Sequence, residues 1–325
     1  MSRCTLLTRR AFFHAMALTG AAAMVPRPLF AMMGNADAPS PLLAKNAPGG
    51  NVHTRPIPAT GEEIPAIGLG SWIVFNVGFD PRAKDERAAV MDAFFQGGGR
   101  MIDSSPMYGS SQDVIGHGYE KLNRPERMFS ADKVWTSDGS EGREQIAESR
   151  KKWNVDRFDL MQVHNLLSWR EHLDTLFAMK KEGEIRYVGI TTSHGRRHGE
   201  FEPIMRDYPL DFVQFTYNVR NRAAEERLLP LARDRGIAVV VNRPFQRGSL
   251  VDFVQRHPLP DWAGEIDCEN WPQILLKFII SHPAVTVAIP ATSQVVHVQE
   301  NVGAMRGRLP DEEMRKRIVR HVENL

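Results

Sequence analysis

The sequence predicts an α/β protein built as a (β/α)8 barrel, also called a TIM barrel, with an N-terminal β-hairpin and C-terminal helices. Short β-rich runs alternate with amphipathic stretches from about Val52 onward, giving eight strands each followed by a helix. Glycines stand at several helix-to-strand turns, where a positive φ ends a helix. The chain has 325 residues, 42% of them hydrophobic, which is enough to bury a core of this size.

The expected strands are the runs rich in β-branched and aromatic residues, at 66–69, 100–103, 129–134, 158–164, 187–191, 212–215, 238–242 and 286–289. The expected helices have apolar residues three and four positions apart, at 85–96, 112–121, 141–153, 172–181, 198–206, 225–235, 271–281 and 295–305. The turn glycines are those at 97–99, Gly183 and Gly236.

The rival architecture is an open, doubly wound sheet, which would place a G-x-G-x-x-G loop after its first strand. Segment 68–73 reads Gly-Leu-Gly-Ser-Trp-Ile and lacks the third glycine, and no other segment supplies the motif. The barrel is therefore favoured. The runs 54–57 and 62–64, joined through Ala-Thr-Gly at 59–61, are expected to form a hairpin that plugs the barrel floor.

Residues 1–50 are expected to form a signal peptide and linker, with the barrel at 51–325. Basic residues come first, an apolar, alanine-rich run follows at 15–25, and small and polar residues fill 32–50. This is the order of regions in a secretory signal. Because a bilayer span needs about 20 apolar residues, no stable membrane anchor is expected.

Segment 8–13 reads Thr-Arg-Arg-Ala-Phe-Phe and resembles a twin-arginine (Tat) signal, whose pattern is Ser/Thr-Arg-Arg-x-Phe followed by an apolar residue. The alternative is a chance arginine pair before an amphipathic helix. The position of the match favours export, which predicts the periplasm as location and the Tat export machinery as a transient partner. Segments 29–31 and 36–38 are both candidate cleavage sites.

The composition argues against nucleic-acid binding and against a metal site. The formal net charge is +2, from 41 Lys+Arg against 39 Asp+Glu, and no basic run is interleaved with aromatics. Of the two cysteines, Cys4 falls in the expected signal, so Cys268 is left as a single thiol. His194 and His198 lie four residues apart but are interpreted as part of a basic loop. No metal site is expected.

Four polar residues stand where barrel enzymes keep their chemistry, at the C-terminal ends of strands. Asp103 ends the second expected strand, with Tyr108 in the loop behind it, and Lys133 and His164 close the third and fourth strands. Each alone has a structural interpretation: a helix cap, an aromatic lid, a strand-end charge and a core histidine. Together at one mouth of the barrel, they favour a catalytic group.

These residues resemble the Asp, Tyr, Lys, His tetrad of the aldo-keto reductases, in spacing and in order. Further patterns typical of that family recur in sequence: Gly-Leu-Gly-Ser-Trp at 68–72, Gly-Glu-Ile-Arg-Tyr-Val-Gly-Ile at 183–190, Ile-Pro-Ala-Thr-Ser at 289–293, and Glu-Asn at 300–301. The resemblance extends from Val52 to Leu325. It implies an NAD(P)H-dependent oxidoreductase that reduces a small carbonyl, an aldehyde or ketone, to an alcohol.

The chemistry explains why these residue types belong together. Reduction needs a hydride at carbon and a proton at oxygen, and a tyrosine of pKa about 10 is a reluctant acid at neutral pH. An ammonium about 4 Å away, at an effective dielectric of about 20, favours the phenolate by roughly 4 kcal/mol, about three pKa units before desolvation losses. The expected roles are Tyr108 as general acid, Lys133 as its tuner, Asp103 as the lysine's anchor and His164 as orienter of the carbonyl.

The resemblance also implies a cofactor site for NADP(H), with NAD(H) as a second cofactor. Asn165, Thr191, Thr192 and Gln214 would hold the nicotinamide carboxamide, and the loop 243–248 would cover the pyrophosphate. The full set of expected cofactor residues is Gly70, Ser71, Trp72, Asn165, Thr191, Thr192, Gln214, Arg243, Pro244, Phe245, Gly248, Thr292, Ser293, His297, Glu300 and Asn301. A surface-exposed basic loop is the alternative for Arg247 and, with less weight, for Arg243.

Three departures from the family pattern bear on this site. Thr192 stands where many relatives have Asn. Asn242 stands where a Tyr often stacks on the nicotinamide, so Trp72 or Phe245 would have to supply the ring. The cation that usually reads the 2′-phosphate near Ala291 and Ser293 is missing, which predicts an NADP(H) preference shallower than is usual in the family.

The substrate cannot be read from the sequence. Trp72, Tyr108 and His164 are expected to line the pocket, and the loop 250–267 with Trp262 is either a further wall or packed structure. Two other functions are weighed: an exported NADP-binding module with little free turnover, and a redox-partner subunit recharged by another protein. Export strengthens the first, because free nicotinamide cofactor is not expected outside the cytoplasm.

Overall fold

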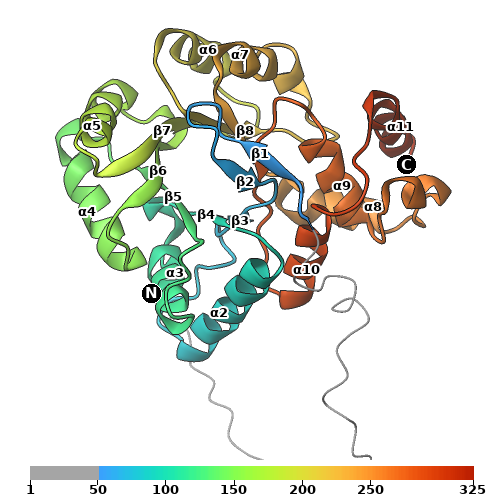
Figure 1. Ribbon diagram of the computed structural model, residues 1–325, viewed down its shortest axis with the longest axis horizontal. Helices are drawn as coiled ribbons and strands as arrows, with labels where there is room; N and C mark the ends of the chain where they lie inside the picture. Colours follow the sequence, from blue (N-terminus) through green and yellow to red (C-terminus); the bar gives the residue numbers. More distant parts are fainter. Residues whose placement is uncertain (1–50) are drawn as a thin grey trace, which may run out of the picture. The chain divides into compact units, whose positions relative to one another are not determined.

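The computed structural model describes residues 51–325, and an eight-stranded parallel sheet forms its centre (Figure 1). The strands follow one another in chain order around the sheet. They are β3 Leu69–Gly70, β4 Met101–Asp103, β5 Phe129–Val134, β6 Phe158–Val163, β7 Ile185–Thr191, β8 Phe212–Thr216, β9 Ala238–Asn242 and β10 Val287–Ala288. All eight expected strands are confirmed to within a few residues.

The sheet closes on itself. The Gly68 N–H donates to the Ala288 carbonyl at 2.8 Å, and the Gly70 N–H donates to the Pro290 carbonyl at 3.0 Å, so that the chain around β3 lies parallel to β10. Such closure leaves no free edge. The predicted (β/α)8 barrel is therefore correct, and the open-sheet alternative is excluded.

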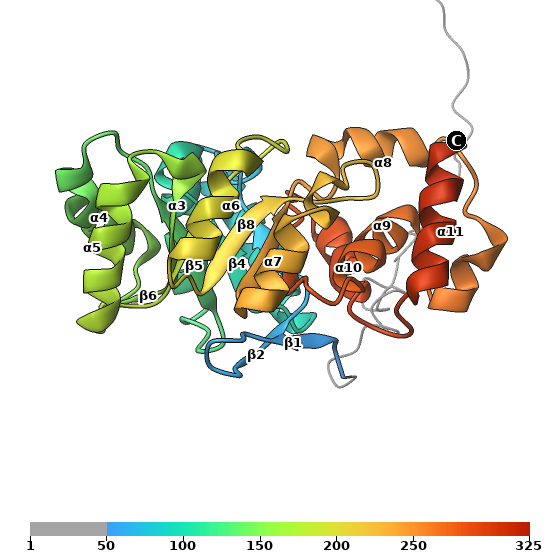
Figure 2. The same ribbon diagram turned by 90° about the horizontal axis from the view of Figure 1, so that it is seen from above.

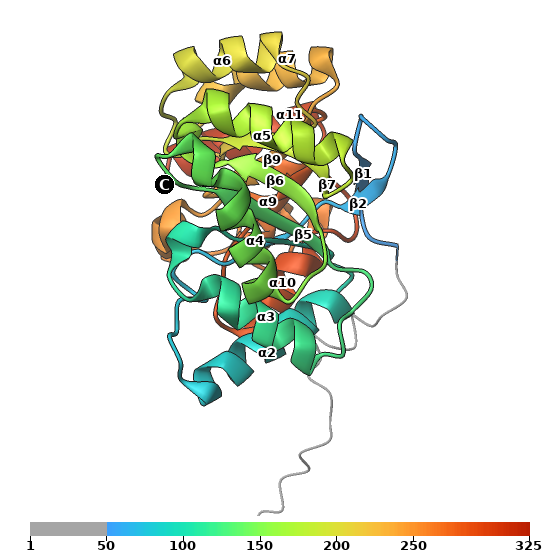
Figure 3. The ribbon, with the colours of Figure 1, turned by 90° about the vertical axis from the view of Figure 1, so that its left-hand side faces the viewer.

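Helices cover the outside of the barrel, and Figure 3 shows α2 to α6 following one another around it. The helices are α2 Pro81–Gln96, α3 Ser111–Lys121, α4 Gly142–Trp153, α5 Trp169–Lys181, α6 His198–Asp207, α7 Leu228–Arg235, α8 Ser249–Val254, α9 Trp271–Ile280, α10 Val295–Gly303 and α11 Glu312–Glu323. All eight expected helices are present. None of those in residues 51–325 is long and apolar enough to cross a membrane.

Helix α2 begins four residues before its expected start, because its local sequence is a strong N-terminal signal. The Asp80 side chain accepts hydrogen bonds from the N–H groups of Arg82 and Ala83, and Pro81 occupies the first turn, where no N–H partner is needed. Helix α8, a short helix in the loop after β9, lies outside the expected ranges. Helix α11 was anticipated only as one of the C-terminal helices.

The hairpin of β1 (Thr54–Pro56) and β2 (Glu63–Pro65) closes one end of the barrel (Figure 2). Ile57 and Ile64 are fully buried and share one apolar cluster with inward-facing strand residues such as Phe129. The predicted plug is confirmed. The opposite end, where the strands have their C-termini, is left for a ligand. The predicted signal peptide and linker, 1–50, lie outside the described residues.

Candidate functional site

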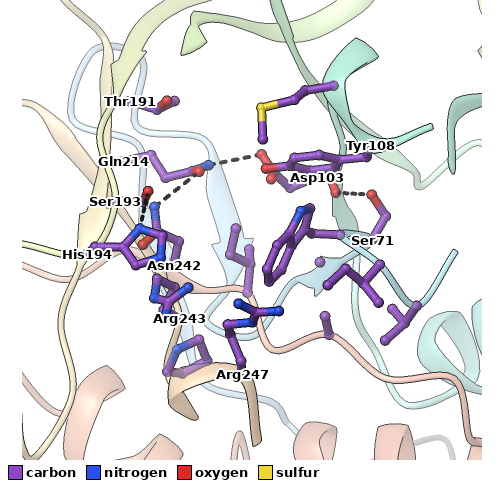
Figure 4. A pocket seen from close by; sticks show the side chains of 18 of the residues that line it. Ser71, Asp103, Tyr108, Thr191, Ser193, His194, Gln214, Asn242, Arg243 and Arg247 are labelled. Carbon is purple, nitrogen blue, oxygen red and sulfur yellow. Dashed lines mark hydrogen bonds between the residues drawn. The ribbon is translucent and has the colours of Figure 1, made fainter. Parts of the chain in front are cut away.

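A cavity of about 510 Å³ opens at the C-terminal ends of the strands, a size typical of small-molecule sites (Figure 4). Loops after β3, β4, β6, β7, β9 and β10 contribute to its wall, and β8 contributes Gln214. The lining residues are Gly70, Ser71, Trp72, Ile73, Val74, Asp103, Met107, Tyr108, His164, Asn165, Thr191, Thr192, Ser193, His194, Gln214, Asn242, Arg243, Pro244, Phe245, Arg247, Gly248, Ile289 and Ala291.

Lys133 and Asp103 form a buried ion pair under the cavity floor. The Lys133 Nζ donates to Asp103 Oδ1 at 2.6 Å and to the Ser104 carbonyl at 2.7 Å. The second Asp103 oxygen accepts from Gln214 Nε2 at 3.0 Å and from Gln162 Nε2 at 3.3 Å. The carboxylate is thus satisfied on both oxygens, which a buried charge requires.

Tyr108 is placed over this pair by a single turn of 3-10 helix, Pro106–Tyr108. Ser105 caps the turn by accepting the Met107 N–H on its side chain at 3.2 Å. The Lys133 Nζ lies 5.3 Å from the centroid of the Tyr108 ring. The His164 ring meets the Tyr108 ring edge-on, with 5.6 Å between centroids and 85° between planes. The structure therefore brings all four expected catalytic residues together.

The protonation of the lysine and histidine follows from burial and from neighbouring charges. Burial alone would lower the pKa of Lys133, but the charges of Asp103 and Tyr108 and the hydrogen bond to Asp103 raise it overall. The anchoring role expected for Asp103 has this physical basis. Burial, together with the positive charge of Lys133, holds the pKa of His164 well below its usual range. The imidazole is therefore neutral at pH 7.

The net shift of the Tyr108 pKa is upward, although the Lys133 charge lowers it as expected. Burial raises the pKa of Tyr108, and this outweighs the lowering by the Lys133 charge. The free-energy cost of burying a phenolate exceeds its attraction to the Lys133 ammonium. The phenol consequently stays protonated at neutral pH, the form that a proton donor needs.

Polar residues of β7, β8 and β9 line one wall of the cavity, and most already have protein partners. The Asn165 N–H donates to Thr191 Oγ1 at 3.0 Å, and Thr192 Oγ1 donates to the Arg196 carbonyl at 2.8 Å. Asn242 is fixed by donating to the Thr192 carbonyl at 2.9 Å. Its amide plane, rather than an aromatic ring, forms this part of the wall.

Two arginines, Arg243 and Arg247, line the wall next to these residues, on the loop after β9. The Arg247 guanidinium lies 4.6 Å from the Trp72 ring centroid, and burial, with the charges of Arg247 and Arg196, lowers the pKa of Arg243. Within residues 51–325, neither Arg243 nor Arg247 has a carboxylate partner. Uncompensated positive charge beside a cavity suits an anionic ligand.

Sequence reasoning missed several residues of the wall: Ile73, Val74, Met107, Ser193 and His194. His194 was interpreted as part of a basic loop. Its position three residues after the expected strand 187–191 was the available signal, because strand C-termini meet at this face.

Five of the expected cofactor residues do not line the cavity. Thr292, Ser293, His297, Glu300 and Asn301 all stand at or just before α10, next in sequence to the lining residue Ala291. Thr292 Oγ1 accepts the Gln294 N–H at 3.1 Å, so this hydroxyl already serves the turn into α10.

The loop 250–267 is packed structure and contributes no residue to the cavity. Trp262 is buried against helix α11, with its ring 5.5 Å from that of His321. Of the two interpretations left open for this loop, the substrate wall is wrong, since α11 covers the indole.

Comparisons with known proteins agree with this geometry. The model of the Aldo/keto reductase family matches residues 66–322. The chain is 26% identical to methylglyoxal reductase YeaE of Escherichia coli K12, over 77% of this chain and 89% of that protein. It is 25% identical to the NADH-specific methylglyoxal reductase of the same organism, over 79% and 94%.

Among solved structures, an aldo/keto reductase from Klebsiella pneumoniae in complex with NADP and acetate superimposes with a TM-score of 0.69 at 24% identity, covering 81% of this chain and 93% of that one. The thermostable aldo-keto reductase Tm1743 gives 0.69 at 28% identity, covering 82% and 99%. The chain therefore belongs to the aldo/keto reductase family and is an NAD(P)H-dependent oxidoreductase.

Proposed function

We propose that this protein reduces a small aldehyde or ketone to an alcohol, with Tyr108 as the proton donor. The observation that carries the proposal is the convergence of Tyr108, His164 and the Lys133–Asp103 pair at the floor of one cavity. The four groups supply an acid, a neutral hydrogen-bond donor and a fixed positive charge. Carbonyl reduction requires a proton donor and groups that stabilise negative charge on the carbonyl oxygen.

The residues of the cavity fit a nicotinamide dinucleotide. Gln214, Asn165 and Thr191 offer amide and hydroxyl groups next to Tyr108, and Arg243 and Arg247 offer positive charge without carboxylate partners. When bound, the cofactor supplies a hydride to the carbonyl carbon. Arg243 and Arg247 would hold its pyrophosphate, as expected from the loop 243–248.

The protein's own part in the reaction is proton transfer and charge stabilisation. The substrate oxygen would accept hydrogen bonds from the Tyr108 hydroxyl and from the His164 imidazole. As the carbon gains a hydride, the Tyr108 O–H bond breaks and its proton completes the alcohol. The phenolate left behind is stabilised by the Lys133 ammonium until a solvent proton restores the phenol.

The raised pKa of Tyr108 fits this order of events. The phenol holds its proton while the substrate enters and gives it up only as negative charge builds on the carbonyl oxygen. Lys133 contributes most after that proton has left, when it faces a phenolate instead of a neutral ring. Lys133 therefore stabilises the charged transition state more than the neutral ground state, which lowers the barrier to reaction.

For the cofactor we propose a preference for NADP(H) over NAD(H) that is shallower than is usual in the family. Ser293 and His297 offer a hydroxyl and an exposed imidazole, and Thr292 is buried with its hydroxyl bonded to the turn into α10, where a fixed cation would hold a phosphate more firmly. A relative is named as NADH-specific, so the family does not dictate the choice. A ratio of dissociation constants above roughly a thousandfold, about 4 kcal/mol, would contradict the shallow preference.

For the substrate we propose small carbonyls with an apolar part. Ile73 and Met107 line the cavity with 52% and 39% of their surface exposed, so a substrate that covers them gains hydrophobic free energy. Two relatives are named methylglyoxal reductases, which makes that aldehyde the first probe. A single-turnover assay with protein-bound NADPH and methylglyoxal or benzaldehyde tests the activity. Oxidation of the bound cofactor supports the proposal, whereas no oxidation across an aldehyde panel would favour a binding module.

We further propose that residues 1–50 export the folded barrel to the periplasm by the twin-arginine route, with its cofactor already bound. The support is the sequence of segment 8–13 and of the apolar run after it. Mass spectrometry of the protein recovered from the periplasm would give the mature N-terminus and any dinucleotide. Full-length protein found only in the cytoplasm would contradict the proposal.

A further inference from the structure

Ser105 contacts both His164 and the turn that carries Tyr108. Its side-chain oxygen lies 2.7 Å from His164 Nδ1, and the same oxygen accepts the Met107 N–H at 3.2 Å. Ser105 is fully buried, and His164 is 95% buried. One hydroxyl therefore caps the turn that carries Tyr108 and contacts the His164 ring that lines the cavity.

We infer that Ser105 is a positioning residue that holds His164 in the tautomer with its proton on Nε2. This inference rests on the proposed function, because it concerns how His164 meets the carbonyl oxygen. A neutral imidazole carries one proton, on either Nδ1 or Nε2, and the partner of one nitrogen fixes the state of the other.

The hydrogen-bond inventory of Ser105 decides between the two tautomers. A hydroxyl has one hydrogen to donate and two lone pairs to accept with, and the Met107 N–H occupies one lone pair. If Ser105 donates to His164 Nδ1, every polar group in the trio is satisfied. If Nδ1 carried the proton, it would donate to Ser105, whose own hydrogen would then have no acceptor among the described residues. A buried unsatisfied hydroxyl is unfavourable, so the first arrangement is preferred.

The hydrogen bond at Nδ1 determines what His164 Nε2 presents to the cavity. Among residues 51–325, the His164 ring has Ser105 as its only hydrogen-bond partner, which leaves Nε2 for the ligand cavity that His164 lines. With its proton on Nε2, the ring donates to a carbonyl oxygen. The other tautomer would present a lone pair to that oxygen and repel it. Ser105 thus determines that the neutral histidine presents an N–H donor, and not a lone pair, to the cavity.

The backbone geometry links the same residue to Tyr108. The Ser105 carbonyl accepts the Tyr108 N–H at 3.0 Å, and the Ser105 side chain closes the start of the turn. Ser105 thereby fixes the turn that carries the phenol and, through its hydroxyl, contacts the imidazole of His164, which comes from the segment after β6. A shift of Ser105 would move both donors that the substrate oxygen meets.

The direct test is long-range ¹H–¹⁵N correlation NMR of the full chain with ¹⁵N-labelled histidine, assigned with His164→Gln. The wild-type protein is expected to show a protonated Nε2 and an unprotonated Nδ1 at pH 7. Ser105→Ala is expected to show a mixture of tautomers, and Ser105→Thr, which keeps a hydroxyl, to restore the wild-type pattern. A wild-type ring protonated on Nδ1 would overturn the inference.

Kinetics give a second readout. Ser105→Ala is expected to lower kcat for aldehyde reduction by at least about tenfold with little change in the dissociation constant of NADPH, and Ser105→Thr to recover most of it. Ser130→Ala, which removes another buried serine hydroxyl at the far end of β5, is the matched control and is expected to change neither the NMR pattern nor kcat. Equal losses in Ser105→Ala and Ser130→Ala would reduce Ser105 to a structural residue.

The tautomer measurement and the test of the proposed function can fail independently of each other. The tautomer is read without turnover, so it stands even when no aldehyde is reduced. Conversely, an active enzyme whose His164 carries its proton on Nδ1 would keep the proposed reaction and remove Ser105 from this role.

Discussion

The ammonium of Lys133 lies 2.6 Å from Asp103 Oδ1, and both side chains are almost completely buried. Gln162 and Gln214 complete the shell of the carboxylate, so Asp103 of β4 is held by side chains from three other strands, β5, β6 and β8. A buried pair of this kind adds little stability compared with apolar residues, but breaking it is costly. Its value is therefore functional, as a fixed positive charge beside Tyr108.

Substitutions of Lys133 and Asp103 should distinguish the effect of the ion pair on stability from its effect on catalysis. Lys133→Met leaves Asp103 as an unpaired buried charge, and the free energy of unfolding should fall by about 3–5 kcal/mol, with kcat at least about 100-fold lower. Adding Asp103→Asn removes the stranded charge, so the double variant should regain most of the stability and none of the activity. Urea unfolding and steady-state kinetics measure both effects. A double variant no more stable than Lys133→Met would contradict the pairing argument.

Asp132 should make the fold less stable as pH rises. Its carboxyl is fully buried, accepts from Gln112 Nε2 at 2.6 Å on one oxygen and has no partner for the other among the described residues. Burial raises its pKa from 3.8 to about 7. The folded state thus favours the protonated form, and stability present below pH 4 is lost as the pH rises toward 7.

A shift of this size corresponds to about 4 kcal/mol between the two limits. Asp132→Asn should therefore flatten the unfolding free energy between pH 4.5 and 7.5 and raise it at the upper end. Asp252→Asn, at an exposed position of α8, is the control and should leave the wild-type slope unchanged. If Asp132→Asn keeps that slope as well, another group carries the pH dependence.

Arg247 should hold the cofactor. Arg247→Ala removes a cation that lies over Trp72 at the cavity and has no carboxylate partner in residues 51–325. The dissociation constant of NADPH is expected to rise about tenfold, the loss of one charge-assisted hydrogen bond. Arg170→Ala is the control, because Arg170 covers Trp169 at the start of α5, away from the cavity. Fluorescence titration measures both, and an unchanged constant in Arg247→Ala would make that arginine a surface charge.

The sequence predicted the strands well because each buried strand is a short, nearly continuous apolar run, such as 238–242, bounded by turn residues. It predicted the grouping of Asp103, Lys133 and His164 because strand ends of a barrel share one face. It could not predict the pKa direction of Tyr108, which depends on how much water the folded loops exclude. Nor could it predict that Trp262 packs under α11, because that contact joins segments far apart in the chain.

The kinetics of Tyr108→Phe test the proposed reaction most directly, since this change removes one oxygen and leaves the ring in place. The dissociation constant of NADPH should stay within about threefold of the wild-type value, while kcat for methylglyoxal or benzaldehyde falls by at least about 100-fold. A variant that binds NADPH normally and still reduces these aldehydes at the wild-type rate would show that the proton comes from another group.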